Sequence, residues 1–338
     1  MRALVFHGIG DVRREELPLP EPRPGEVRLR PLATGICGTD AHIMRGEFPA
    51  PVPAVLGHET AGTVDAVGRG VAHVREGDLA TVQPNTFCGL CRYCRQGREH
   101  LCTEMRAFGV HMPGGFAEAM VATAGAVYRL PDGTDPRTGC LTEPLACAVH
   151  GMDRLAMSSG STVLVLGAGL LGLMLTRLAR LAGAGLVAAG EPHADRRADA
   201  LAFGASFAAD PREEGSREAL MGLTGGHGFD NVIDAAGSSA TFEAAVSLAA
   251  RGGRILVFGV APMDAAATLR PYDVFARELT IVGSLINPYT HDRAVSLLPQ
   301  MGLEKLRLAA FPLDRYREAF AAQAAGTAAT KVLLLPQE

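Results

Sequence analysis

Four of the seven cysteines in this 338-residue chain lie within one short stretch. Their spacing is Cys-x2-Cys-x2-Cys-x7-Cys, and four thiolates so close in sequence can converge tetrahedrally on one metal ion. We therefore predict a structural zinc with no coordination position left for a substrate. The main alternative is an iron–sulfur cluster, whose bacterial run ends with a three-residue gap and a proline, whereas here the last gap is seven residues and threonine follows. The predicted ligands are Cys88, Cys91, Cys94 and Cys102.

A second possible metal set is spread more widely along the chain. Cys37 offers a thiolate, His58 an imidazole and Glu143 a carboxylate. Three protein ligands with a fourth position open are typical of catalytic zinc. Each residue could instead have an ordinary structural role. A single cysteine is usually buried in the core, a single histidine usually makes hydrogen bonds, and a glutamate before proline often begins a helix. The stretches 37–42 and 57–59 carry mainly loop and turn signals, so we expect these side chains on loops.

A glycine-rich motif suggests a nucleotide site. The spacing Gly-x-Gly-x-x-Gly directly follows the strand-like run TVLVL and opens an amphipathic helix. In that context the first glycine permits the turn, the second lets a pyrophosphate approach and the third lets the helix pack on the strand. Bare N–H groups and the helix dipole then hold the phosphates. The predicted cofactor-binding residues of the motif are Gly167, Gly169, Leu170, Leu171 and Gly172.

An acidic residue about 20 positions further on is expected to bind the ribose. Glu191 follows the run LVAAG at about that distance. A carboxylate there accepts the ribose 2′-hydroxyl and repels a 2′-phosphate, which favours NAD over NADP. The alternative is a solvated loop glutamate. Arg196 and Arg197 follow closely and could stack on adenine or bind a 2′-phosphate, so NADP stays open as the less favoured cofactor.

The elements that must position these residues differ between two halves of the chain. Up to about residue 150, short β-type runs alternate with Gly- and Pro-rich turns, which predicts an all-β texture. From Gly151 apolar strands alternate with helical segments, which predicts a parallel sheet with helices on both faces. After Gly283 a helix over 314–325 and the strand KVLLL are expected to return to the first domain. The predicted class is α/β.

Composition narrows the function classes. The net charge is −4 without a basic patch, so nucleic-acid binding is not expected. No apolar window reaches the roughly 18 residues of a membrane span, and the N-terminus has no signal-peptide pattern. An odd number of cysteines argues against a disulfide framework. We therefore expect a soluble cytoplasmic protein that acts on a small molecule.

Taken together, these motifs resemble those of the zinc-dependent medium-chain alcohol dehydrogenases. Cys37-Gly38-Thr39-Asp40, Gly57-His58-Glu59, the four-cysteine stretch, Glu143-Pro144-Leu145 and GAGLLG occur in that family's order. The resemblance implies a GroES-like catalytic domain around a Rossmann doubly wound parallel-sheet domain. The implied bounds are 1–150 for the catalytic domain with a zinc lobe at about 86–104, 151–285 for the cofactor domain, and 286–338 for the segment that completes the catalytic domain.

Glu143-Pro144-Leu145 is similar to the sorbitol, arabinitol and threonine dehydrogenase branch. In that branch residues matching Cys37 and His58 hold the catalytic zinc, and Glu59 or Glu143 completes the set. The resemblance thus implies two zinc ions per chain, NAD as cofactor, and oxidation of a secondary alcohol, such as a polyol, to a ketone. Family members are usually dimers or tetramers, so a homo-oligomer is expected.

The resemblance also implies a route for the released proton. Thr39 accepts it and passes it, by way of the cofactor ribose, to His42 near solvent. The alternative interpretation of His42 is an ordinary surface histidine. Asp40 is expected to bond the far nitrogen of His58.

Two other functions stay open. An L-threonine or amino-alcohol dehydrogenase would use the same metal set, whereas a non-catalytic dinucleotide-binding sensor would need only the structural zinc. Sorbitol dehydrogenases carry an Arg-Tyr pair where this chain has residues 285–289, so sorbitol itself is not the expected substrate.

Overall fold

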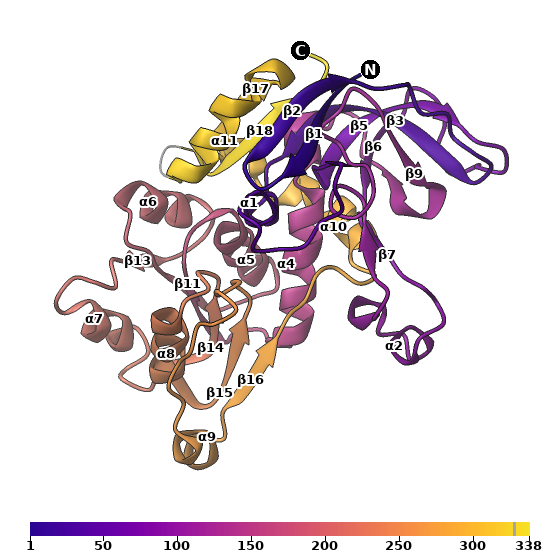
Figure 1. Cartoon of the computed structure of the whole chain (residues 1–338). Helices are drawn as coiled ribbons and strands as arrows, with labels where there is room; N and C mark the ends of the chain where they lie inside the picture. Colours follow the sequence, from indigo (N-terminus) through magenta and orange to yellow (C-terminus); the bar gives the residue numbers. More distant parts are fainter. Residues whose placement is uncertain (327–328) are drawn as a thin grey trace. The chain divides into compact units, whose positions relative to one another are not determined.

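The computed structural model describes residues 1–326 and 329–338, and the chain forms two compact units (Figure 1). Unit 1 contains residues 1–146 and 288–338, and unit 2 contains residues 147–287. The sequence placed the domain changes at about 150 and 285. Within the described ranges, no helix has both the length and the apolar character that a membrane crossing requires.

Unit 1 is built mainly from strands. A seven-stranded sheet has the order β10-β6-β5-β3-β18-β17, with β9 also paired to β3, and a second sheet has the order β2-β1-β4. The strands are β1 (Arg2–Gly8), β2 (Asp11–Glu16), β3 (Glu26–Gly35), β4 (Ala54–Val55), β5 (Glu59–Val67), β6 (Leu79–Val82), β7 (Asn85–Thr86), β8 (Arg106–Ala107), β9 (Met120–Thr123), β10 (Val127–Arg129), β17 (Leu308–Pro312) and β18 (Lys331–Leu335). The helices are α1 (Gly38–Met44), α2 (Arg92–Arg95), α3 (Pro136–Gly139), α10 (His291–Leu297) and α11 (Tyr316–Ala325), and α4 (Thr142–Leu155) begins here.

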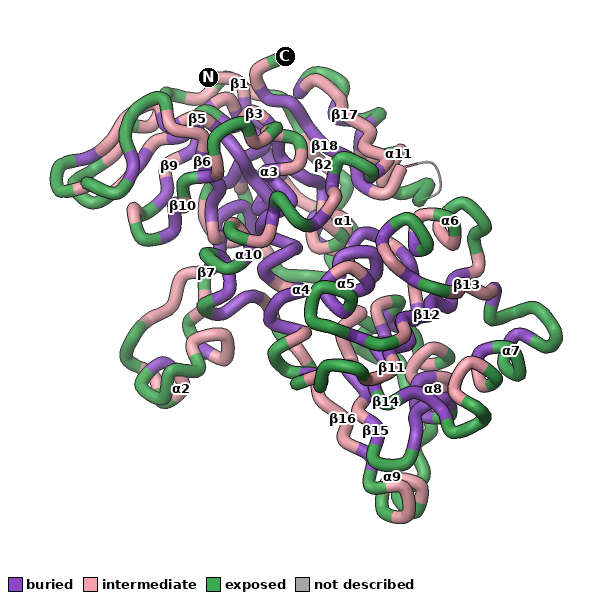
Figure 2. Tube along the Cα trace, turned by 180° about the vertical axis from the view of Figure 1, so that it is seen from behind, coloured by how far each residue is buried: buried purple, intermediate pink, exposed green. Residues whose placement is uncertain are grey.

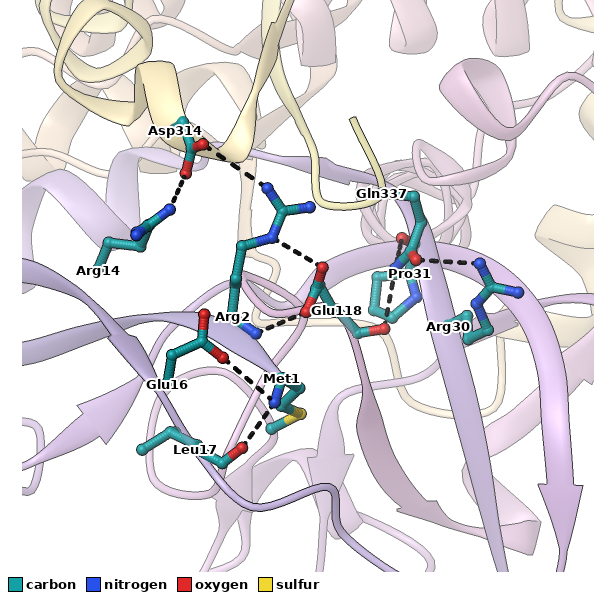
Figure 3. Close-up of polar contacts among 10 residues, drawn as sticks. All are labelled: Met1, Arg2, Arg14, Glu16, Leu17, Arg30, Pro31, Glu118, Asp314 and Gln337. Carbon is teal, nitrogen blue, oxygen red and sulfur yellow. Dashed lines mark hydrogen bonds and ion pairs between the residues drawn. The ribbon is translucent and has the colours of Figure 1, made fainter.

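The C-terminal segment completes the large sheet of unit 1. Strand β18 pairs with β3, so residues about 300 apart in sequence become neighbours. Figure 3 shows polar contacts in the same region. The Arg2 guanidinium donates to Glu118 at 2.8 Å and lies 3.6 Å from the carboxylate of Asp314. Gln337 donates to the carbonyl oxygens of Pro31 and Glu118. The tail and the first 146 residues thus belong to one compact unit.

One prediction about local structure was wrong. The stretch after Cys37 is not a loop, because residues 38–44 form helix α1. Cys37 lies in an extended conformation at the N-cap position, and the Asp40 carboxylate accepts its backbone N–H at 2.8 Å. An acidic side chain in the first turn satisfies an otherwise orphaned amide there. Thr39 and His42 therefore lie on one helix, three residues apart.

Unit 2 contains the predicted parallel sheet. All neighbouring strands run parallel in the order β13-β12-β11-β14-β15-β16. The strands over 162–166 and 186–190 are nearly continuous apolar runs and are mostly buried (Figure 2), as is usual for parallel strands covered on both faces. The elements are β11 (Thr162–Leu166), α5 (Leu170–Leu181), β12 (Leu186–Gly190), α6 (Ala194–Ala202), β13 (Phe207–Ala209), α7 (Ser216–Gly222), β14 (Phe229–Asp234), α8 (Ser239–Leu248), β15 (Ala249–Val257), α9 (Pro271–Arg277) and β16 (Thr280–Gly283).

Candidate functional site

The four clustered cysteines lie in a lobe that leaves and re-enters the fold through the short β7–β8 pair. The Sγ–Sγ distances are 3.9 Å between Cys88 and Cys94, 3.6 Å between Cys91 and Cys94, and 3.5 Å between Cys88 and Cys102. A tetrahedron of sulfurs about 2.3 Å from zinc has edges of roughly 3.8 Å. The thiols are thus already spaced for a closed four-sulfur zinc site.

Backbone amides around the lobe favour thiolates. The sulfur of Cys88 accepts from the N–H groups of Leu90 and Cys91, and the sulfur of Cys102 accepts from those of Cys88 and Glu104. Hydrogen bonds from backbone amides, led by that of Cys94, lower the pKa of Cys91 to about 6. Metal binding requires deprotonated sulfur, so this loop geometry supports it.

The second set converges in unit 1. Donor atoms of Cys37, His58 and Glu59 all lie within 4.8 Å of one another. Helix α1 positions Cys37 at its N-cap, whereas His58 directly precedes β5 and Glu59 is the first residue of that strand. A thiolate, an imidazole and a carboxylate form a donor set that suits zinc.

The electrostatics of this group favour a cation. The imidazole Nδ1 of His58 lies 3.6 Å from the Asp40 carboxylate, which is fully buried. Burial opposes protonation of His58, but the charges of Asp40 and Cys37 outweigh it and raise the pKa of His58 well above its usual value. Neither Asp40 Oδ1 nor His58 Nδ1 makes a hydrogen bond within the described residues. A metal ion on the other imidazole nitrogen would turn His58 Nδ1–H toward Asp40, as carboxylates behind metal-bound histidines usually require.

Lys331 is a member of the site that sequence reasoning missed. Its ammonium lies 2.7 and 2.6 Å from the two carboxylate oxygens of Glu59, and both side chains are buried. Gly35 lies on β3, which pairs with the strand of Glu59 on one side and with that of Lys331 on the other. A Cβ atom at Gly35 would be only 2.1 Å from a carboxylate oxygen of Glu59. The only available signal was that Lys331 is one of two lysines in a chain whose other basic residues are arginines.

The remaining residues predicted for catalysis lie in unit 1 as well. Glu143 is buried in the first turn of α4 and does not belong to the three-residue group found among the described residues. The hydroxyl of Thr39 lies 3.7 Å from the sulfur of Cys37. His42 is partly exposed at the end of α1, next to Glu47. Thus Thr39 is near the metal-binding group, and His42 faces solvent.

The nucleotide motif has the predicted strand–turn–helix context in unit 2. Gly167 has a φ of +96°, which favours glycine, and Gly169 is the N-cap of α5. A Cβ at Gly172 would lie 1.9 Å from the carbonyl oxygen of Gly167, so this glycine is needed for close packing. A Cβ at Gly169 would meet nothing within 4 Å. Its backbone therefore faces open space, as an approaching phosphate requires. Leu170 and Leu171 form the first turn of α5.

Glu191 follows β12 and contacts the glycine-rich turn. Its carboxylate accepts the N–H of Ala168 at 2.8 Å and that of His193 at 2.9 Å, and its side chain is buried. Arg197 donates to the carbonyl oxygen of Glu191. Arg196 is half-buried on α6. Glu191 thus fixes the turn that would hold the cofactor phosphates.

Comparison with known proteins agrees with this architecture. Residues 23–132 match the alcohol dehydrogenase GroES-like domain, and residues 171–299 match the zinc-binding dehydrogenase family. A structure described as a zinc-binding dehydrogenase from Sinorhizobium meliloti 1021, bound to NADP, is 36% identical with a TM-score of 0.95, and the match covers 99% of each chain.

Curated relatives match over nearly the full length. D-altritol 5-dehydrogenase from Agrobacterium fabrum is 34% identical over 98% of each chain. L-threonine 3-dehydrogenase from Pyrococcus horikoshii is also 34% identical, over 95% of this chain and 94% of the relative. This chain belongs to the zinc-dependent medium-chain alcohol dehydrogenases, which are oxidoreductases.

Proposed function

We propose that this protein oxidises a secondary alcohol of a polyol or sugar alcohol to a ketone, with NAD as the hydride acceptor. The observation that carries the proposal is the convergence of Cys37, His58 and Glu59 in unit 1, with Asp40 behind the imidazole. A relative acting on D-altritol supports the polyol class.

The side chains of this group have separate tasks. When bound, zinc supplies Lewis acidity toward an alcohol oxygen and the nicotinamide supplies the hydride acceptor. Cys37, His58 and a carboxylate, Glu59 or Glu143, would hold the metal, and Asp40 orients His58. Thr39 accepts the alcohol proton near Cys37, and His42, one turn further along the same helix face, exchanges it with solvent.

The cofactor preference rests on Glu191, whose carboxylate stands at the end of β12 beside the glycine-rich turn. A negative charge there disfavours a 2′-phosphate. The relative from Sinorhizobium meliloti binds NADP, so both cofactors belong in the test. The cytoplasm is the proposed location, because four zinc-binding thiolates stay reduced there.

The second candidate substrate is L-threonine or another amino alcohol, since a relative with that activity is 34% identical. The same metal group serves both reactions. A spectrophotometric screen of NAD and NADP reduction with polyols, L-threonine and simple alcohols separates them. Metal analysis should give two zinc ions per chain, whereas a non-catalytic binding protein would hold one and reduce neither cofactor.

We also infer self-association through the edge of the unit 2 sheet. Among the described strands, β16 pairs only with β15, and an uncovered strand edge can pair with an identical strand about a two-fold axis. Large apolar side chains are exposed in the flanking segment 260–275; they are Val260, Met263, Leu269, Tyr272 and Phe275. Light scattering should report a dimer or a larger assembly built from dimers, and a proline at Ile281 should reduce it to monomers. A monomeric wild type would contradict this inference.

A further inference from the structure

The chain folds back on itself directly after helix α1. Gly46 has a φ of +76°, a conformation that favours glycine, and a Cβ there would lie 2.5 Å from the side chain of Ile9. The turn brings Glu47 back to the helix, where its N–H donates to the carbonyl oxygen of His42 at 2.9 Å. The glycine thereby places the Glu47 carboxylate beside the imidazole of His42.

Three side chains form a closed polar cluster at this turn. Glu47 Oε2 lies 2.5 Å from His42 Nδ1. The Arg45 guanidinium donates to both oxygens of Glu47, at 2.7 and 2.8 Å. Its Nη2 lies 3.1 Å from His42 Nδ1 because both nitrogens contact the same oxygen, Oε2 of Glu47. A bidentate arginine–carboxylate pair holds its geometry better than a single contact does. Glu47 is therefore fixed on one nitrogen of the His42 ring.

The contact distance locates a proton. A carboxylate oxygen and an imidazole nitrogen approach to 2.5 Å only with a proton between them, because two lone pairs would repel each other. The paired Arg45, followed by His42, lowers the pKa of Glu47 to about 2, so the carboxylate is ionised near neutral pH. The proton therefore belongs to His42 Nδ1, which leaves the lone pair on Nε2.

We infer that Glu47, held by Arg45, positions His42 for proton exchange by fixing the Nδ1–H tautomer. The inference rests on the proposed function, in which His42 exchanges the alcohol proton with solvent. In that exchange Nε2 gains one proton, the ring becomes an imidazolium that still donates Nδ1–H to Glu47, and Nε2 returns one proton to water. Glu47 is a positioning residue, because it acts through His42 and not on the substrate.

A spectroscopic experiment tests the tautomer without any substrate. The full-length, zinc-loaded protein is labelled with 15N at histidine Nδ1, and solid-state spectra are recorded at a pH where imidazoles are neutral. The resonance that disappears in His42→Gln identifies His42. We expect it at the position of a protonated Nδ1 in the wild type, and shifted toward an unprotonated nitrogen in Glu47→Ala. An unchanged resonance in Glu47→Ala would overturn the inference.

Kinetics test the consequence for turnover. Glu47→Ala is expected to lower kcat about tenfold with KM unchanged, since general acid–base groups contribute at least that much. In a His42→Ala background the same change should have no further effect, and added imidazole should restore part of the rate in either variant. A loss of equal size in the His42→Ala background would contradict the inference.

The chain offers a matched control. Glu15 Oε1 lies 2.5 Å from His7 Nε2, which forms a histidine–glutamate pair of the same kind on β1 and β2. Glu15→Ala should leave kcat unchanged, and an equal loss there would mean that the Glu47 effect is not specific to His42. If the wild type oxidises no alcohol with either cofactor, the proposed function fails, while the spectroscopic result still decides the tautomer.

Discussion

His291 should make the folded chain sensitive to acid. This first residue of α10 is 1% exposed, and its ring centroid lies 4.8 Å from that of Tyr128. Within the described part of the chain, neither ring nitrogen makes a hydrogen bond. Burial without a partner disfavours the imidazolium and lowers the pKa of His291 from 6.5 to about 3.

The sign and size of the effect follow from proton linkage. Between pH 6.5 and about 3 the unfolded chain carries a proton on His291 that the folded chain does not, so the free energy of unfolding falls as the pH falls. These two pKa values give a loss of about 2 kcal/mol between pH 8 and pH 5, and roughly 4 kcal/mol by pH 3.

Urea unfolding followed by circular dichroism measures this contribution. His291→Phe keeps an aromatic ring against Tyr128 but does not titrate, so its free energy of unfolding should fall by about 2 kcal/mol less than that of the wild type between pH 8 and pH 5. His291→Leu should show the same difference, which separates the loss of titration from the choice of ring. Parallel pH curves for the wild type and both variants would refute the reasoning.

Three further predictions concern the metal sites. Cys37→Ser should abolish turnover and reduce zinc from two ions to one per chain with little change in the unfolding midpoint; an active variant would contradict the assignment. Cys91→Ser should instead lose the lobe zinc and lower thermal stability, because a structural metal contributes directly to folding; unchanged melting would speak against that role. Lys331→Met should lower the free energy of unfolding by about 3–5 kcal/mol in urea, because one negative charge of this buried group then lacks a balancing cation; equal stability would show that the ammonium does not neutralise a charge there.

The parallel sheet and the two clearest motifs were predictable because their signals are local. Buried parallel strands are continuous apolar runs, and the four cysteines and the glycine-rich turn each lie within one short stretch. Helix α1 was not predicted, because Gly38 and Thr39 follow Cys37 with ordinary turn signals. The Asp40 carboxylate that satisfies the Cys37 amide is visible only in the structure. Strand β2 was also not predicted, because its mostly charged residues do not alternate with apolar ones.

The choice between the two candidate glutamates depends on a residue that no local pattern links to them. Lys331 is 272 positions away from Glu59 and reaches it only because β18 and β5 both pair with β3. Metal ligands bind deprotonated, so Cys37 and Glu59 contribute two negative charges around a neutral His58, and the Asp40 carboxylate behind that ring contributes a third. The ammonium of Lys331 compensates one of them, and the remaining two equal the charge of one zinc ion. Adding Glu143 as a further ligand would exceed that balance, so we propose Glu59, through a lone pair that Lys331 leaves open, as the carboxylate that shares the metal.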